Sequence, residues 1–538
     1  MSLARGAAAI TFVTAVSRIT GFVRVVAVAG AMGTTFLANT YQTANTAPNV
    51  IFELVAAGVL TSVFVPTFVS YLVKGDEEEG WRAGDALTSV ALVALIVIAA
   101  VVALAAPLIM RLLTIGVGDD ALRADEISLG TTFLRLFAPQ LVFYGLGMIM
   151  TAALHARRRF GLAAAAPIFN NIVVIAVYIA YAVSRGSSPP EVGAITDGQV
   201  LLLGLGTTAG VIAMTLCLVP GLVRAGWRFR FNFAPSHPAV RKGARLGAWA
   251  LGYAGGYQAG LIAVLILANR VEGGVAAYQW AFTFFYLPHA LVSVPIFSVL
   301  FTAMSEHAAR GEMDDLTERL RDGLKMLFFI LVPIALGYIA LAGPLARVTL
   351  LVGVMTEGGA DLVGRVLVAF ALGLPGYSVF LTFSRAFYAV GDTRAPAIVN
   401  AIGVVVATAL GAALFLALPA DWAVAGLALG HSIGFTVAAA ILGRRYARVH
   451  GHLINEEVGR SVIQVGGVGT VTVLIMAAIA TLARDNSALA LVGGGLVGAA
   501  VYAGAMAALG APELRRIMGL GRSLAKGSTN RPRDGKDL

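Results

Sequence analysis

The chain has 538 residues, of which 58% are hydrophobic and only 13% are charged, and its formal net charge is +10. Soluble domains carry about 25% charged residues, so this composition and a mean hydropathy of +0.84 exclude an ordinary cytosolic enzyme and a disordered chain. A single cysteine excludes an internal disulfide scaffold. The composition predicts a protein embedded in a lipid bilayer.

Apolar runs long enough to cross about 30 Å of hydrocarbon occur fourteen times along the chain. They are residues 7–33, 48–72, 86–110, 129–154, 162–183, 199–223, 246–269, 276–304, 326–351, 362–390, 395–418, 423–442, 462–482 and 488–509. The sequence therefore predicts an all-α polytopic membrane protein with about 14 transmembrane helices. Several runs contain proline, which removes a backbone hydrogen bond, so we expect bent helices. These residues are Pro66, Pro107, Pro139, Pro288, Pro295, Pro333 and Pro375.

The positions of the basic residues predict the orientation of the chain. Membrane proteins collect lysine and arginine in cytoplasmic loops. With both termini placed in the cytoplasm, every inside segment carries basic residues, and the outside loops hold only Arg123, Arg185, Arg270 and Arg484. The first apolar run is too long for the core of a signal peptide, so we expect no cleavable signal. We expect a multi-pass protein with both termini in the cytoplasm.

A short internal repeat predicts two halves of six spans each. The fourth span is followed by Pro167 with Asn171 four places on, and the tenth by Pro396 with Asn400 at the same spacing. Such a match is typical of a duplicated transporter. The predicted domains are an N-lobe, a cytoplasmic linker, a C-lobe, two further helices and a disordered cytoplasmic tail. Their ranges are 1–223, 224–245, 246–442, 443–510 and 511–538.

The linker is basic and contains four aromatic residues, Trp227, Phe229, Phe231 and Phe233. A nucleic-acid surface is one interpretation of such a pattern. Next to a membrane, a segment that lies on anionic lipid is the better interpretation. We therefore expect membrane lipids as partners and no nucleic acid.

The first span carries two arginines, Arg18 and Arg24, on one broad side with Thr14, Ser17 and Gly21. Arg24 lies about 9 Å further along the helix axis than Arg18. An arginine at the bilayer centre costs at least about 2.5–3.5 kcal/mol, so it normally faces a partner or a hydrated cavity. The favoured interpretation is a cavity for an anionic ligand, because the guanidinium matches phosphate and carboxylate oxygens. An ion pair, or arginine side chains that extend to the interface, are the alternatives.

The second span contains one acid well inside an apolar run, Glu53. A single carboxylate cannot neutralise both arginines. Glu53 is either a partner of Arg18 or Arg24 in an ion pair, or a site for a proton or another cation, and the sequence favours neither.

Signals for enzyme chemistry are weak. His289 and His431 are the only histidines far inside spans, and neither has an acid at metal-ligand spacing. The sequence has no Walker-type phosphate loop. We therefore expect no enzyme activity, metal or cofactor, and transport driven by an ion gradient or the membrane potential. The alternatives are a cation-coupled drug exporter, a membrane enzyme acting on polyprenyl phosphates, and a scaffold in a cell-wall complex.

The first two spans resemble the start of a known family. Four short segments are similar to the MurJ (MviN) lipid II flippases. They are the run from Ser17 to Arg24, Pro48 with Asn49, Ala57 with Gly58, and 64–66 (Phe-Val-Pro). The segment 385–388 (Arg-Ala-Phe-Tyr) with Asp392 and Thr393 agrees.

The resemblance implies a member of the multidrug and oligosaccharidyl-lipid exporter superfamily in a bacterial plasma membrane. It implies two six-helix lobes around a central cavity, with helices 13 and 14 forming a groove for a polyprenyl tail. The implied function is movement of lipid II, a glycopeptide linked to undecaprenyl pyrophosphate, to the outer leaflet. The implied substrate-binding residues are Arg18, Arg24, Asn49 and Glu53, with lipid II as partner and a coupling cation as a further one.

The chain departs from the family pattern at four positions. Val25 stands where relatives often have an acid, and Phe52 and Glu53 stand where they have two arginines. Thr283 aligns with a cavity arginine of the eighth helix. The predicted site is therefore less cationic, and another polyprenyl-linked glycan is an alternative cargo.

Overall fold

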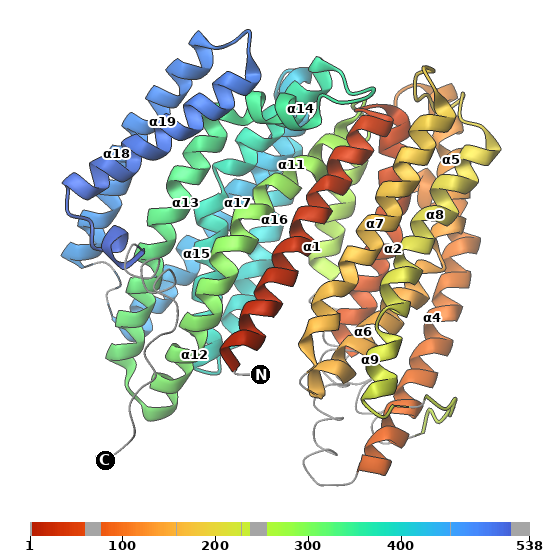
Figure 1. Cartoon of the computed structure of the whole chain (residues 1–538), viewed down its shortest axis with the longest axis horizontal. Coiled ribbons are helices and arrows are strands. Elements are labelled where there is room, and N and C mark those ends of the chain that lie inside the picture. The colour runs from red at the N-terminus through yellow and green to blue at the C-terminus, as the bar shows by residue number, and fades with distance from the viewer. Residues whose placement is uncertain are drawn as a thin grey trace. The chain divides into compact units, whose positions relative to one another are not determined.

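The computed structural model describes residues 3–59, 77–157, 159–227, 229–236, 255–451, 453 and 455–517. Within these residues the chain is built of helices, without β-strands (Figure 1). The helices are α1 (Leu3–Met32), α2 (Phe36–Val59), α4 (Glu77–Leu113), α5 (Asp120–Phe137), α6 (Gln140–Ala156), α7 (Phe160–Arg185), α8 (Asp197–Leu216), α9 (Val219–Arg224), α11 (Gly274–Pro288), the π-helical turn η2 (His289–Ser293), α12 (Val294–Arg310), α13 (Met313–Leu350), α14 (Glu357–Ala371), α15 (Leu374–Ala389), α16 (Arg394–Ala417), α17 (Ala420–His450), α18 (Glu456–Leu482) and α19 (Ser487–Ala508).

Polar residues at the ends of the apolar runs set several helix boundaries. Asp119 accepts a hydrogen bond from the Leu122 backbone at the start of α5. Thr196 and Gln199 form a capping box at the start of α8. These side chains satisfy backbone N–H groups that the first helical turn leaves without partners. These caps fix where α5 and α8 begin.

The described residues contain 11 helices long and apolar enough to cross a membrane, or up to 12 when α14 and α15 count as one span bent by 44°. These twelve correspond to twelve of the fourteen predicted spans. The other two predicted spans, 48–72 and 246–269, lie partly outside the described residues. The described part of the second one contains the helix Gly255–Ala268. The membrane-spanning, all-helical prediction is confirmed.

Proline explains where three predicted spans change direction or geometry. Pro139 separates α5 from α6, Pro288 precedes η2, and Pro375 lies in the first turn of α15. Proline lacks the N–H that a continuing helix needs, so the break falls at or beside it. Pro107 and Pro333, by contrast, lie inside the continuous helices α4 and α13.

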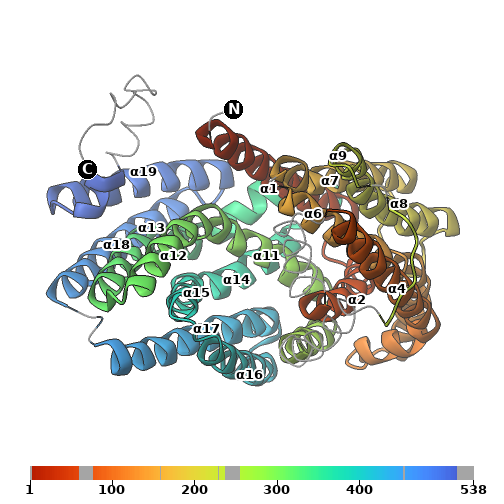
Figure 2. The ribbon, with the colours of Figure 1, turned by 90° about the horizontal axis from the view of Figure 1, so that it is seen from below.

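The chain forms two compact units, and the first comprises Met1–Leu287, Ala346–Phe370 and Asn400–Gly434. In this unit α1 packs along α7, and α7 packs along α8 (Figures 1 and 2). Tyr41 on α2 is fully buried, and its hydroxyl lies 3.1 Å from the Tyr178 hydroxyl and 2.6 Å from that of Thr207. These hydrogen bonds tie α2 to α7 and α8 without leaving a polar group unpaired in lipid.

A backbone contact joins the end of α1 to the turn that precedes α14. The Val354 N–H donates to the carbonyl of Gly30, 3.0 Å away, at the end of α1. Gly353 has φ +60°, and a Cβ on it would collide with the Gly30 backbone. Only glycine permits this backbone angle and this close approach without strain.

The linker predicted at 224–245 is described up to residue 236, except for 228. Trp227 is buried, and its indole N–H donates to Asp85, 2.9 Å away. Phe229, Phe231 and Phe233 are exposed. Exposed phenylalanines beside a membrane span suit a segment lying on lipid, while the domain ranges themselves stay a prediction. Of the predicted tail, the structure describes only 511–517, where 512–517 are helical and Ala511 and Glu513 are buried; the rest lies outside the described residues.

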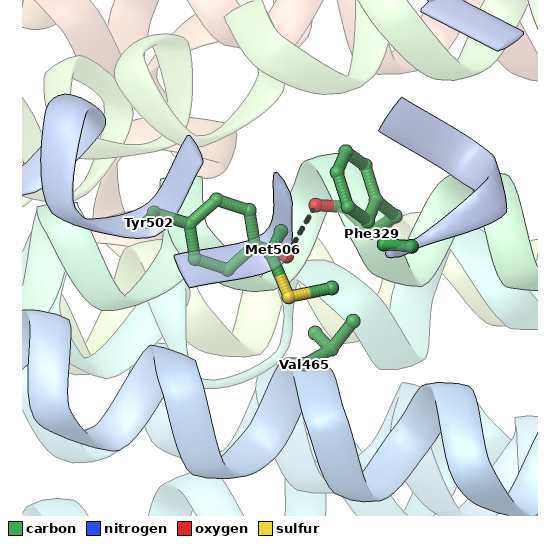
Figure 3. Packing of buried hydrophobic residues seen from close by; sticks show 5 residues of the cluster. Phe329, Val465, Tyr502 and Met506 are labelled. Carbon is green, nitrogen blue, oxygen red and sulfur yellow. Dashed lines mark hydrogen bonds between the residues drawn. The ribbon is translucent and has the colours of Figure 1, made fainter. Parts of the chain in front are cut away.

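The second unit comprises Pro288–Leu345, Ala371–Val399 and Phe435–Leu538. Its last two long helices, α18 and α19, pack against each other and against α13. The contact contains Phe329, Val465, Tyr502 and Met506, and the Tyr502 hydroxyl donates to the Phe329 carbonyl at 2.9 Å (Figure 3). Lipid is as apolar as these side chains, so packing and this hydrogen bond, rather than transfer from water, hold the helices together.

Candidate functional site

The first unit contains a polar cavity of about 100 Å³ lined by Arg24. Its wall comes from α1, α2, α6, α7, α8 and α11. The other lining residues are Val25, Val28, Gln42, Asn45, Tyr144, Asn170, Val174, Tyr178, Thr207, Val211, Gln279, Trp280 and Thr283. No acidic residue is among them, so Arg24 gives the wall a net positive charge.

The Arg24 guanidinium makes no hydrogen bond and no ion pair with any residue that the structure describes. Three further polar atoms of the wall are buried without a partner there: Oδ1 of Asn45, Oδ1 of Asn170 and Nε1 of Trp280. Buried polar groups are nearly always hydrogen-bonded in folded proteins. The cavity therefore offers unused donors and acceptors to a polar ligand or to water.

Contacts between α1 and α7 set the rotation of the arginine-bearing helix. The Asn171 amide donates to Thr20 Oγ1 at 3.0 Å and to the Ser17 carbonyl at 3.3 Å. Gly21 lies beside the same amide. Phe22, the next residue of α1, packs edge-on against Phe284 with ring centroids 5.1 Å apart. These contacts fix the face of α1 that Arg24 presents.

Tyr178 and Thr207, whose hydroxyl groups both bond to Tyr41, line the cavity. A further bond, from Gln140 Nε2 to Thr208 Oγ1 at 3.1 Å, ties α6 to α8. Buried side-chain hydrogen bonds hold helices in a defined arrangement. The wall is thus built before a ligand enters.

The structure places Arg18 in a different environment from Arg24. Arg18 is exposed, and its guanidinium carbon lies 5.7 Å from the ring centroid of Tyr286 on α11. Six residues turn an α-helix by about 240°, so the two side chains point roughly 120° apart. We expected both arginines on one broad side of the helix. The structure instead has Arg24 in the cavity wall and Arg18 on a neighbouring surface of α1.

Asn49 and Glu53 lie further along α2, outside the cavity lining. The Asn49 amide donates to the Asn45 carbonyl at 2.9 Å, one turn back towards the cavity. Glu53 is exposed and makes no salt bridge with Arg18 or Arg24 within the described residues. Of the four predicted residues, the structure brings Arg24 into the wall and leaves the other three around it.

Two of the four positions where the chain departs from the family pattern line this cavity, and a third packs against one of its residues. Val25 and Thr283 both line it, and the Thr283 hydroxyl donates to the Gln279 carbonyl at 3.1 Å. Phe52 packs against the cavity residue Tyr144 with ring centroids 5.4 Å apart. Neutral groups thus occupy three positions where the family pattern has charge, and Arg24 is the only charged residue of this lining.

Several cavity residues were not predicted from the sequence, namely Gln42, Asn45, Asn170, Gln279 and Trp280. All are polar or amphipathic residues within or beside apolar runs, which is a usable signal in a membrane protein. Asn170 also neighbours Asn171, which the internal repeat singled out. Which of these polar residues face the same cavity depends on helix packing that the sequence pattern does not contain.

The second unit contains an apolar cavity of about 430 Å³ between α13, α18 and α19. Gly495 lines it, and a Cβ there would meet nothing within 4 Å. A Cβ on the nearby Gly498 would meet the side chain of Met476, so that glycine permits close helix packing. Both glycines line the cavity, and they contribute in different ways: Gly495 leaves space, and Gly498 permits close approach of α18 and α19.

A metal-compatible group lies at the turn between α12 and α13. His307, Glu312 and Asp315 have ligand atoms within 4.8 Å of one another. His307 Nδ1 already lies 2.8 Å from Glu312, and Arg310 approaches the same carboxylate at 4.0 Å. The group is partly solvent-exposed and does not line the Arg24 cavity.

These features define a polytopic membrane protein with a small anion-compatible cavity, and known structures share its fold. The fold is similar to that of a solved structure of lipid II flippase MurJ in an inward closed conformation, with a TM-score of 0.76, 20% identity and coverage of 93% of this chain and 98% of that one. It is also similar to an inward-facing multidrug resistance MATE family transporter of the MOP superfamily, with a TM-score of 0.66, 14% identity and coverage of 83% and 95%.

The sequence comparisons identify the family. A probable lipid II flippase MurJ of Rhizobium tropici is 29% identical over 458 residues, which is 85% of this chain and 83% of the relative. Lipid II flippase MurJ of Burkholderia cenocepacia is 25% identical over 447 residues, covering 82% and 83%. The family model described as lipid II flippase MurJ matches residues 28–494. The chain belongs to the MurJ family.

Proposed function

We propose that this protein moves lipid II from the cytoplasmic to the outer leaflet of the bacterial plasma membrane. The observation that carries the proposal is Arg24, a cationic side chain that has no hydrogen-bond or ion-pair partner among the described residues and lines a polar cavity of a MurJ-family chain. An uncompensated guanidinium at membrane depth is costly unless an anion or water meets it. The diphosphate of lipid II is such an anion.

In this mechanism Arg24 donates two parallel hydrogen bonds to diphosphate oxygens. The unpartnered Trp280 indole N–H donates a further hydrogen bond to the diphosphate, and the Oδ1 atoms of Asn45 and Asn170 accept hydrogen bonds from hydroxyl groups of the adjoining sugar. Arg18 and Asn49 contact the headgroup as it enters or leaves. The apolar cavity between α13, α18 and α19 accommodates part of the polyprenyl tail, which stays in a lipid-like environment throughout.

Transport then follows alternating access, with both termini in the cytoplasm and no covalent chemistry on the substrate. Glu53 is the proposed residue that links transport to an ion gradient. Its exposure and its lack of a salt bridge within the described residues leave the carboxylate open to a cation.

A second candidate cargo, another polyprenyl-linked glycan, is favoured by one specific observation. Val25 and Thr283 line the cavity where family members carry charged residues. A less charged wall changes which sugar and peptide groups it can recognise. The diphosphate, which both cargoes share, would still bind Arg24.

The test is complementation in a bacterium depleted of its own lipid II flippase. The wild type should restore growth, and Arg24→Ala should fail at equal membrane level. Arg135→Ala is the matched control, because Arg135 is an exposed span arginine outside the cavity, bonded to the Ala103 carbonyl. Rescue by Arg24→Ala would refute the anion site. Failure of a correctly inserted wild type would refute lipid II as cargo and would point to another glycan.

A further inference from the structure

A buried carboxyl group in the first unit has no role in the proposed transport steps. Glu126 on α5 is completely buried, and its Oε2 accepts one hydrogen bond of 3.0 Å from the Asn269 amide. Its other oxygen, Oε1, has no partner among the described residues. Asn269 follows the helix Gly255–Ala268 and is itself buried.

No cationic side chain in the described part of the chain forms a salt bridge with Glu126. Arg123 on the same helix is half-buried, and Arg270, next to Asn269, is exposed. Asp125 and Glu272, the neighbouring acids, are exposed as well. On α2, the helix packed against α5, Tyr41 is the only ionisable side chain between Phe36 and Thr46, and its hydroxyl bonds Tyr178 and Thr207 instead.

Neutral polar side chains lie next to the Glu126 carboxyl group. Thr40 of α2 lies beside it, and the Thr40 hydroxyl donates to the Phe36 carbonyl at 2.9 Å. Oδ1 of Asn269, whose amide N–H binds Glu126, is buried without a partner among the described residues. An uncompensated carboxyl group thus has neutral oxygen atoms on neighbouring side chains.

The local backbone is fixed independently of this carboxyl group. The Asn39 amide of α2 donates to the Val271 carbonyl at 2.8 Å, and its oxygen accepts from the Val275 N–H at 3.0 Å. These two bonds hold the turn after Asn269 against α2. Asn269 and Glu126 are thus held in place by other contacts.

An ionised carboxylate buried with one hydrogen bond and no counter-charge is strongly unfavourable. A proton or a bound metal ion removes this penalty, and carboxylate, amide and hydroxyl oxygens are ligands that suit a hard cation. We propose that Glu126, Asn269 and Thr40 form a binding site for a monovalent cation, either Na⁺ or a proton, that neutralises the Glu126 carboxylate. The site is distinct from Glu53.

The position of the site gives it a route to the substrate cavity. Thr40 precedes the cavity residue Asn45 by five residues on α2, about 7.5 Å along the axis. A cation that joins α2, α5 and the turn after Asn269 therefore stabilises the helix that carries Gln42 and Asn45. This coupling role rests on the proposed transport function, whereas cation binding itself does not.

The experiment uses the purified full chain in lipid nanodiscs, without substrate. One arm measures binding of ²²Na⁺ at fixed pH and ionic strength. The other arm records the infrared C=O stretch of a protonated carboxylic acid in Na⁺-free buffer as the pH is varied. The variants are Glu126→Gln, which keeps the shape and the bond to Asn269, and the matched control Asp125→Asn on the exposed neighbour.

The proposal expects one arm to give a signal in the wild type and in Asp125→Asn, and expects Glu126→Gln to lose it. Binding of ²²Na⁺ would identify Na⁺ as the cation of this site. A carboxylic-acid band without ²²Na⁺ binding would identify the proton as the cation. The proposal is overturned when the wild type shows neither signal, or when Glu126→Gln retains the signal in full. The wild-type measurement alone can refute the proposal, so the test remains valid even if the Glu126→Gln variant folds poorly. Failure of lipid II transport would leave these readings unchanged.

Discussion

Replacement of Arg24 by alanine should weaken binding of a lipid diphosphate without disturbing the fold. Arg24 makes no hydrogen bond or ion pair within the described residues, so its loss removes no internal contact of that kind. A hydrogen bond to a charged group contributes about 1.5–3 kcal/mol, which corresponds to roughly a 10- to 150-fold rise in Kd. Half-burial of Arg24 exposes the interaction to some solvent screening, so the lower part of this range is expected.

Trp280 supplies the assay, because its indole lines the same cavity as Arg24. Titration of the purified protein with farnesyl diphosphate should change the tryptophan fluorescence, and Trp280→Phe identifies the part of the signal that comes from the cavity. Arg24→Lys keeps the charge but loses the planar fork, so its Kd should fall between those of the wild type and Arg24→Ala.

The same titration of Arg135→Ala controls for the loss of one positive charge. Arg135 lies outside the cavity lining, so its Kd should stay within twofold of the wild type. An Arg24→Ala protein that binds within twofold of the wild type would refute the anion site. An equal loss in Arg135→Ala would show that net charge, and not the cavity, sets the affinity.

Two further predictions concern stability and are measured by thermal unfolding in detergent. Gly353→Ala should destabilise the protein by about 1–3 kcal/mol, because φ is +60° and the added Cβ would meet the Gly30 backbone. Gly358→Ala is the control, because a Cβ there meets nothing within 4 Å. It should change the stability by less than about 0.5 kcal/mol. Tyr502→Phe should cost about 0.6 kcal/mol by removing the bond to the Phe329 carbonyl, and an unchanged unfolding midpoint would contradict the importance of that bond.

Hydropathy predicted where helices cross the membrane because a span needs about 20 apolar residues whatever its neighbours are. Proline placed three irregularities correctly, at Pro139, Pro288 and Pro375, since the missing N–H acts locally. Pro107 and Pro333 lie in unbroken helices, because neighbouring groups can compensate for a lost bond in a membrane helix. Local chemistry thus predicts where a bend is allowed, and packing decides whether it forms.

The candidate site was predicted less completely than the spans. Arg24 stood out because a charge in an apolar run needs a reason. Glu126 did not, because it precedes the predicted span 129–154 and lies outside the apolar run. Its burial depends on Asn269, which lies 143 residues later in the chain. Pairings of that range follow from tertiary packing and leave no periodic signal in the sequence.

Charge connects the proposed cation site with the proposed anion site. An ionised Glu126 would add a negative charge to the same unit that must accept a diphosphate next to Arg24, and a neutralised Glu126 would not. Binding of the cation and binding of the diphosphate should therefore favour each other, and linkage requires the effect to be reciprocal. The Kd for farnesyl diphosphate should fall when Na⁺ is added, or when the pH is lowered if the proton is the ligand. Glu126→Gln should bind with a Kd that no longer responds, whereas Glu53→Gln should keep the response. A response that survives in Glu126→Gln and disappears in Glu53→Gln would assign the coupling to Glu53 instead.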